Sequence, residues 1–166
     1  MPPVNPRHSV RAILLDEDDR VLLCRHAIPG PAGTTVVWAA PGGGVEPGET
    51  RLAALRRELR EEVGLTAFDA EPLPVWRQEV AAPESAPGHD GVVNDYFLIR
   101  TRSFTPRGAM SDGELAAENI TGLRWWSLAE VVGYRGTDLF SPRDLATPLA
   151  ALIADGAPAG PIALGL

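Results

Sequence analysis

The sequence contains no lysine, a single cysteine and no long apolar segment. All 15 basic residues are arginines, and the 22 acidic residues give a formal net charge of −7, which argues against a nonspecific nucleic-acid partner. Cys24 alone can form no intrachain disulfide, and a lone thiol suits a reducing cytoplasm. No apolar run approaches the ~20 residues of a membrane helix, and the first residues lack the apolar core of a secretory signal. We therefore expect a cytoplasmic protein that binds neither nucleic acid nor membrane.

The 166 residues, 45% of them hydrophobic, have the size and composition of one globular domain. We expect that domain to span 1–166, with its core over about 9–154 and an irregular tail over 155–166, which is rich in Gly, Pro and Ala. The segments 27–35 and 81–91 are predicted to be loops because turn-forming residues dominate them. Apolar runs predict strands over 10–15, 21–24, 36–38, 75–80, 93–100 and 120–126. Helical periodicity predicts helices over 50–63, 127–132 and 141–154, and Ser141 is expected to cap the last of them. The fold class is therefore α/β, a mixed sheet covered by helices.

Three glutamates lie on one face of the helix predicted over 50–63. Glu58, Glu61 and Glu62 are spaced i, i+3 and i+4, so their carboxylates project from neighbouring turns. A merely solvated helix would interleave its charges, and its Arg57–Glu61 ion pair would contribute only a few tenths of a kcal/mol. Segregated carboxylates favour the alternative, a site for a hard divalent cation such as Mg²⁺.

The spacing around these glutamates resembles a known motif. From Gly43 to Leu65 the sequence matches every specified position of the Nudix box, G-x5-E-x7-R-E-U-x-E-E-x-G-U, where U is a bulky aliphatic residue. The preceding Pro41-Gly42 and the stretch 124–130 are also similar to Nudix domains. The resemblance implies a Nudix-type α/β/α sandwich with a mixed β-sheet, in which the box forms a catalytic loop–helix–loop.

The resemblance also implies a metal-dependent hydrolase of nucleoside diphosphates linked to another moiety. Its cofactor would be Mg²⁺ or Mn²⁺, held by the carboxylates of Glu58, Glu61 and Glu62, which we call the box acids. The carbonyl of Gly42 would be a backbone ligand. Two further residues, Arg57 and Glu49, would orient the carboxylates through a salt bridge.

The residue that deprotonates the attacking water is left open. Within the box, Glu58 and Glu61 are candidates, and outside it Glu114 and Glu118 are. Glu118 is expected on a mobile loop over 112–118, where some Nudix hydrolases supply an additional acidic ligand. The alternative is that Glu118 is a solvated surface acid.

Two residues are candidates for contact with the substrate, a small nucleotide. Arg25, at the end of a predicted strand, would bind a phosphate unless it is simply an exposed strand-end arginine. Trp38 would stack on a base, or else be wedged against the box helix. A homodimer is compatible with the sequence.

The choice of substrate rests on elimination. The sequence lacks the markers that accompany the box in Nudix subfamilies acting on NADH or coenzyme A. In the subfamilies acting on ADP-ribose or dinucleoside polyphosphates, a proline or tyrosine marker follows the box. At the corresponding positions this sequence has no tyrosine, and its Pro83 lies at the margin. Nucleoside triphosphates, including oxidised ones, are therefore favoured. The alternatives are ADP-ribose or a nucleotide sugar, or a sensor that binds a nucleotide derivative without hydrolysing it.

Overall fold

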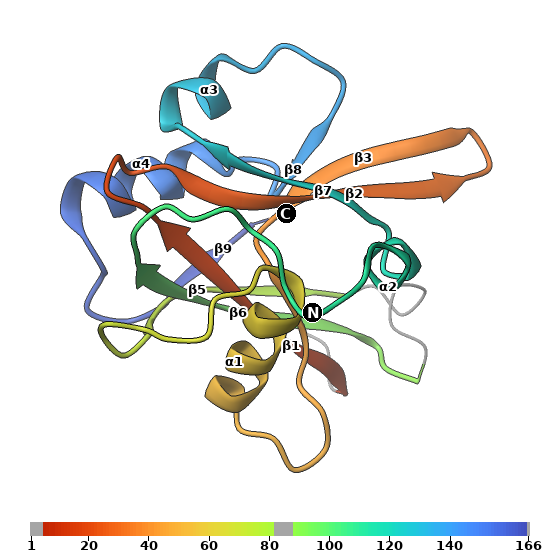
Figure 1. The fold of residues 1–166 in the computed structure, drawn as a ribbon, viewed down its shortest axis with the longest axis horizontal. Coiled ribbons are helices and arrows are strands. Elements are labelled where there is room, and N and C mark those ends of the chain that lie inside the picture. Colours follow the sequence, from red (N-terminus) through yellow and green to blue (C-terminus); the bar gives the residue numbers. More distant parts are fainter. Residues whose placement is uncertain (1–4, 82–87, 166) are drawn as a thin grey trace.

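The computed structural model describes residues 5–81 and 88–165, which form a mixed sheet with helices on both faces (Figure 1). The elements are β1 (Pro6–Leu15), β2 (Val21–Gly30), β3 (Gly33–Ala39), β4 (Gly42–Gly44), α1 (Arg51–Glu62), β5 (Leu73–Val80), β6 (Gly91–Arg100), α2 (Asp112–Ala117), β7 (Ile120–Trp126), α3 (Leu128–Gly133), β8 (Leu139–Ser141), α4 (Ala146–Asp155) and β9 (Ile162–Leu164). No helix among these residues is both long and apolar enough to cross a membrane.

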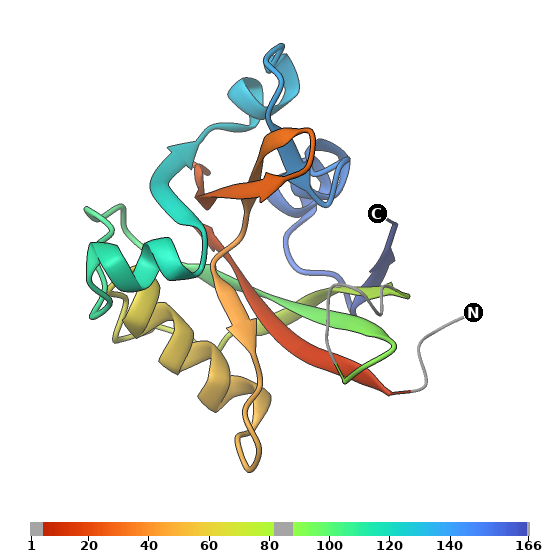
Figure 2. The ribbon, with the colours of Figure 1, turned by 90° about the vertical axis from the view of Figure 1, so that its right-hand side faces the viewer.

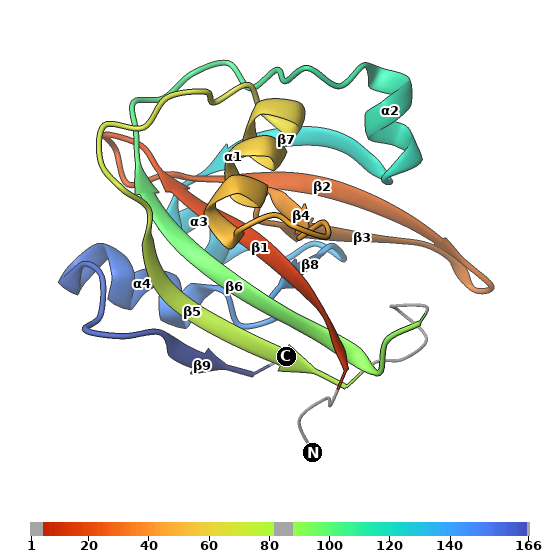
Figure 3. The same cartoon turned by 90° about the horizontal axis from the view of Figure 1, so that it is seen from below.

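The sheet divides into two wings along β1. Its strand order is β8-β3-β2-β1-β6-β5-β9, with β4 paired to β1 and β7 to β2. β1 pairs in parallel with β6 along its whole length, whereas its register with β2 is confined to Leu15 and Val21. Beyond that point β4 takes the free edge of β1, and β2 diverges with β3 and β7 (Figure 2). Figure 3 shows β9, β5, β6 and β1 lying in succession in the other wing.

The core has one apolar cluster on each face of β1, as the two-residue period of a strand requires. Val10, Ala12 and Leu14 belong to the cluster that packs against α1, whereas Ile13 and Leu15 belong to the cluster that includes α4. The predicted α/β/α sandwich with a mixed sheet is therefore confirmed.

The segment 27–35 was expected to be a loop but forms the outer half of a hairpin. β2 and β3 remain in antiparallel register from Cys24 and Ala39 out to Gly30 and Gly33. The prolines and glycines there favour a loop, but the β-branched run Thr34-Thr35-Val36 favours a strand, and pairing with β2 decides the outcome.

Two C-terminal expectations were also wrong. The last long helix begins at Ala146, because Ser141 pairs with Ala39 as part of β8, and the carboxylate of Asp144 accepts bonds from the backbone N–H and hydroxyl of Thr147. The tail over 155–166 is not wholly irregular, since Ile162–Leu164 pairs in parallel with the otherwise open edge of β5. Of the predicted 81–91 loop, residues 82–87 lie outside the described residues.

The segment 112–118, expected to be a mobile loop, is the short helix α2. The Ser111 hydroxyl accepts a bond from the Glu114 N–H, and the Glu114 carboxylate accepts one from the Ser111 N–H, which is a capping box. Glu118 is its C-cap residue.

We expect the box helix to depend on its apolar stripe for stability. Leu59 is fully buried and Leu73 is 49% exposed. Leu59→Ala should lower the free energy of unfolding by about 2–5 kcal/mol, and Leu73→Ala by less than about 0.5 kcal/mol. Urea denaturation measures both, and equal losses would contradict the packing described.

Candidate active site

The box helix α1 is fixed at its start by Thr50, whose hydroxyl accepts a bond from the Ala53 N–H at 3.1 Å. The buried Leu55 and Leu59 anchor the helix on the sheet. This orientation directs Glu58 and Glu62 toward the glycine strand β4, and both side chains are buried there, 7% and 1% exposed.

The guanidinium of Arg57 links the loop, the helix and the strand. Its Nε and Nη2 donate to the two carboxylate oxygens of Glu49 at 2.8 and 2.9 Å. Nη1 donates to Glu58 Oε1 at 2.9 Å and to Glu61 Oε2 at 3.4 Å, while Nη2 also reaches the Gly44 carbonyl at 3.0 Å. The hydrogen bonds from Arg57 lower the pKa of Glu49 to about 2, and those to Glu49 raise the pKa of Arg57. Arg57 therefore contacts Glu49 and two of the box acids, and its expected role in orienting them stays a prediction.

Glu62 is the most enclosed of the box acids. Its Oε1 accepts a bond from the Gly42 N–H at 2.9 Å. Burial, and then the neighbouring charge of Glu58, raise its pKa to about 8. Burial also raises the pKa of Glu58, although the hydrogen bond from Arg57 opposes this. The site thus confines two carboxylates in a volume that disfavours two negative charges.

Glycines allow this close approach. A Cβ on Gly43 would lie 2.5 Å from Glu58 Oε1, and one on Gly42, whose φ is +148°, would lie 2.0 Å from the Val10 carbonyl. A side chain at either position would therefore displace the acids or the strand. The structure shows the Gly42 N–H in use, and the predicted role of its carbonyl as a ligand stays a prediction.

The donor set fits a hard divalent cation. Carboxylate oxygens are the ligands that Mg²⁺ prefers, and a cation would relieve the repulsion between Glu58 and Glu62. Among the described residues, no three His, Cys, Asp or Glu side chains are already gathered closely enough to hold an ion. The reason is visible in the contacts, because Glu58 and Glu61 turn toward Arg57 while Glu62 turns toward Gly42. Binding would therefore require rotation of these carboxylates.

Glu118 reaches the same region from a distant part of the chain. It is exposed, and its charge contributes to raising the pKa of both Glu58 and Glu62. Glu114, the other outside candidate for the base, has its carboxylate engaged in capping α2. Of the two, Glu118 is the acid whose charge acts on the box acids, and its role as base or ligand stays a prediction.

Trp38 and Arg25, the two predicted substrate contacts, lie in different environments. Trp38 is 8% exposed, meets the Trp126 ring edge-on at 5.1 Å, and donates from Nε1 to Asp138 at 2.9 Å. Its ring is therefore neither open to a base nor wedged against α1, but belongs to the core cluster on the opposite face. Arg25 is partly buried and donates to the Thr121 hydroxyl at 2.9 Å, and its contact with phosphate stays a prediction.

Two further residues, one on β1 and one on β2, have electrostatic effects that the sequence did not indicate. Arg11 lies opposite Gly42 in the β1–β4 ladder, donates to the Ala40 carbonyl at 3.1 Å, and its charge lowers the pKa of Glu62. Burial, with a smaller effect of Arg11, lowers the pKa of His26 to about 4, which keeps this imidazole neutral at pH 7. The sequence signal for Arg11 is its position in an otherwise apolar strand. It shares a face of β1 with Ile13 and Leu15, which are both buried.

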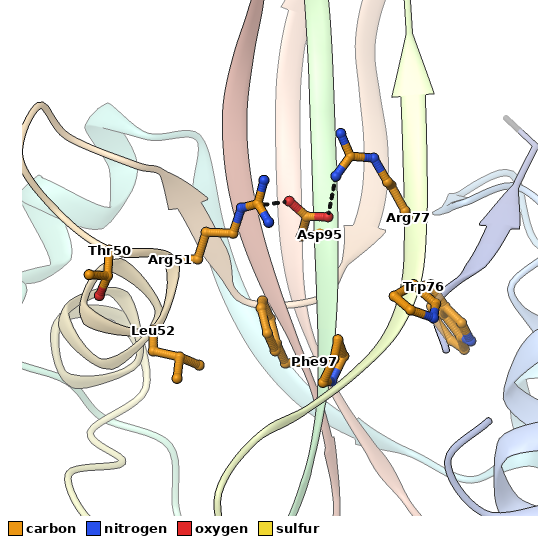
Figure 4. Close-up of a pocket in the computed structure, with 9 residues that line it drawn as sticks. Thr50, Arg51, Leu52, Trp76, Arg77, Asp95 and Phe97 are labelled. Atoms are coloured by element: carbon orange, nitrogen blue, oxygen red, sulfur yellow. Dashed lines mark hydrogen bonds and ion pairs between the residues drawn. The ribbon is translucent and has the colours of Figure 1, made fainter. Parts of the chain in front are cut away.

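A separate cavity of about 600 Å³ lies between the start of α1 and strands β5 and β6, and no box acid lines it (Figure 4). Asp95 bridges Arg51 and Arg77 there, at 3.2 Å from each (Figure 4).

The raised pKa of Glu62 predicts a pH dependence of stability in the metal-free protein. The folded pKa of about 8 exceeds the usual value of 4.5, so the stabilisation is complete below pH 4.5 and is lost as the pH rises through 8. Glu62→Gln should therefore make the metal-free protein more stable than the wild type by a few kcal/mol above pH 8, and the gain should vanish below pH 4.5. Urea titrations at a series of pH values, with the more exposed Glu61→Gln as the control, measure the difference. A gain independent of pH would contradict the account.

Comparison with known proteins agrees with this geometry. The NUDIX domain family model matches residues 5–146. An RNA pyrophosphohydrolase of Halorhodospira halophila is 44% identical over 72 residues, which cover 43% of this chain and 36% of the relative. The nucleoside triphosphatase NudI of Salmonella arizonae is 38% identical over 93 residues, covering 52% of this chain and 61% of the relative.

The fold agrees as well. The solution structure of the E. coli ORF135 protein is 25% identical, with a TM-score of 0.57 over 90% of this chain and 92% of that one. The chain spans less than two thirds of the two curated relatives. Because the family model covers most of the chain, including the helix that carries the box acids, the protein belongs to the NUDIX domain family.

Proposed function

We propose that the protein is a divalent-metal-dependent pyrophosphohydrolase. It would cleave the diphosphate bond of a nucleoside diphosphate linked to another moiety, with nucleoside triphosphates, including oxidised ones, as the favoured substrates. The observation that carries the proposal is the buried pair Glu58 and Glu62, held against β4 with Glu61 and Arg57 beside them. Carboxylates buried at this cost to stability are typical of a functional site.

The acids have distinct tasks in this proposal. Glu58, Glu61 and Glu62 would hold Mg²⁺ or Mn²⁺, and such a cation neutralises diphosphate charge and makes water more acidic. Arg57 keeps Glu58 and Glu61 in place, and the Gly42 N–H does so for Glu62. Glu118 takes a proton from the attacking water. The oxygen of that water bonds to phosphorus, and the bridging P–O bond breaks, so that the bridging oxygen leaves with the departing group.

The substrate would be held by positive charge on the central strands. Arg11 and Arg25 are partly buried, project from β1 and β2, and form no ion pair among the described residues. Their guanidinium groups are suited to the oxygens of a polyphosphate. The relatives named as RNA pyrophosphohydrolase and nucleoside triphosphatase support a phosphoanhydride substrate.

Two alternatives remain. An ADP-ribose or nucleotide-sugar hydrolase would use the same acids with a different pocket. A sensor that binds without hydrolysis is less favoured, because every acid of the box is present. The proposal also includes a cytoplasmic location, with which the buried free thiol of Cys24 is consistent.

We expect hydrolysis that requires a divalent cation and increases toward alkaline pH. The test is a panel of nucleoside triphosphates, oxidised nucleotides, ADP-ribose and nucleotide sugars, assayed for phosphate or pyrophosphate release with Mg²⁺ and with EDTA. Glu62→Gln should abolish turnover. Activity that survives EDTA would contradict the mechanism, while tight binding of a nucleotide without turnover would favour the sensor.

Glu118→Gln should lower kcat by at least ~10²-fold, the lower end of a general-base contribution. Its effect on the stability of the metal-free protein should be small, because the side chain is exposed. Glu71→Gln, at another exposed acid, is the matched control. A near-normal kcat would mean that Glu118 is a surface acid and that the base lies within the box.

A further inference from the structure

The C-terminal end of α1 is covered by the segment 107–110. The N–H groups of Arg107, Ala109 and Met110 donate to the carbonyls of Val63, Arg60 and Glu61, at 3.0, 3.0 and 2.9 Å. The last carbonyls of a helix have no partner within it, so these three bonds supply what the helix end lacks. The segment is thereby attached to the turn that carries Glu61 and Glu62.

Gly108 is the point of closest approach. A Cβ there would lie 2.1 Å from the Glu61 carbonyl oxygen, 2.4 Å from the Glu61 carbonyl carbon and 2.7 Å from that of Glu62. These neighbours are backbone atoms, which cannot turn aside as a flexible side chain can. Only glycine allows the segment to lie directly on the peptide groups of two box acids.

The same segment is followed directly by α2, whose C-cap residue is Glu118. Figure 1 shows the green trace that follows β6 continuing into α2. Ser111 caps α2, and Leu115 of that helix is buried against Cys24 and Ile120. Just after the C-terminal end of α2, the Asn119 carbonyl accepts a bond from the Ala27 N–H at 2.8 Å. The path from Gly108 to Glu118 is therefore held at its start by the backbone bonds of segment 107–110, in its middle by the buried Leu115, and at its end by the bond to Asn119.

We propose that Gly108 is a positioning residue, which fixes Glu118 relative to the box acids by allowing segment 107–110 to lie against the backbone of Glu61 and Glu62. The inference rests on the proposed function, in which Glu118 is the base.

Glu118 is exposed and follows a helix of only six residues. The backbone bonds of segment 107–110 attach the start of that helix to the end of α1, and so restrict the positions that Glu118 can take.

The attachment itself is tested by amide hydrogen exchange. Gly108→Ala should lower the protection of the Ala109 and Met110 amides by at least ~10-fold. Gly113→Ala is the matched control, because a Cβ on Gly113 meets only the Ser111 hydroxyl, at 3.9 Å. Unchanged protection in Gly108→Ala would overturn the inference.

The catalytic consequence is tested by a double-mutant cycle. Gly108→Ala should lower kcat by at least ~10-fold, as expected for a displaced catalytic group, with little change in KM. In a Glu118→Gln background the same substitution should have no further effect. An equal loss of kcat in both backgrounds would show that Gly108 acts through the box acids themselves, and would overturn the proposal. A normal kcat in the Glu118→Gln single variant would overturn it as well.

Failure of the proposed function is distinguishable. If no substrate in the panel is hydrolysed, the same four proteins are compared for Mn²⁺ affinity by electron paramagnetic resonance. Weaker binding in both single variants, with no further loss in the double variant, supports the positioning of Glu118 without hydrolysis. Affinities equal to that of the wild type overturn it.

Discussion

The salt-bridge group around Arg57 is the interaction on which the site depends. One guanidinium contacts the loop before α1 through Glu49, the helix itself through Glu58 and Glu61, and β4 through the Gly44 carbonyl. It is partly buried, so its bonds are weakly screened by water. Without this charge, the loop would lose its attachment to the helix and the acids would face one another uncompensated.

Local features of the site were predictable from the sequence because they follow from spacing along one helix. The period of α1 places Leu59 inward and groups Glu58, Glu61 and Glu62, and the capping pattern of Ser111 and Glu114 could have revealed α2 in the same way. These signals involve residues within one or two turns of each other. They require no knowledge of what the rest of the chain does.

Features that depend on distant segments were not predictable. Trp38 appeared suited to stacking on a base, and only the packing of Trp126 and the bond to Asp138 reveal it as core. Likewise, Ile162 pairs with β5 because that edge is open in the assembled sheet, although the local sequence there resembles a tail. The position of Arg11 beside the acids depends on β4 lying along β1.

The acid group shows how the fold offsets an unfavourable arrangement. Burial of Glu58 and Glu62 disfavours their ionised forms, yet a divalent cation can be held only by ionised carboxylates. Besides the salt bridges of Arg57, the fold keeps the acids together by contacts that do not depend on their charge: the leucine stripe of α1, the glycines of β4, and the backbone bonds of segment 107–110. Because those contacts are formed by apolar and backbone atoms, the geometry can persist while protonation changes. In the proposed function, a site built this way would exchange protons for a cation without refolding, which is what repeated turnover would require.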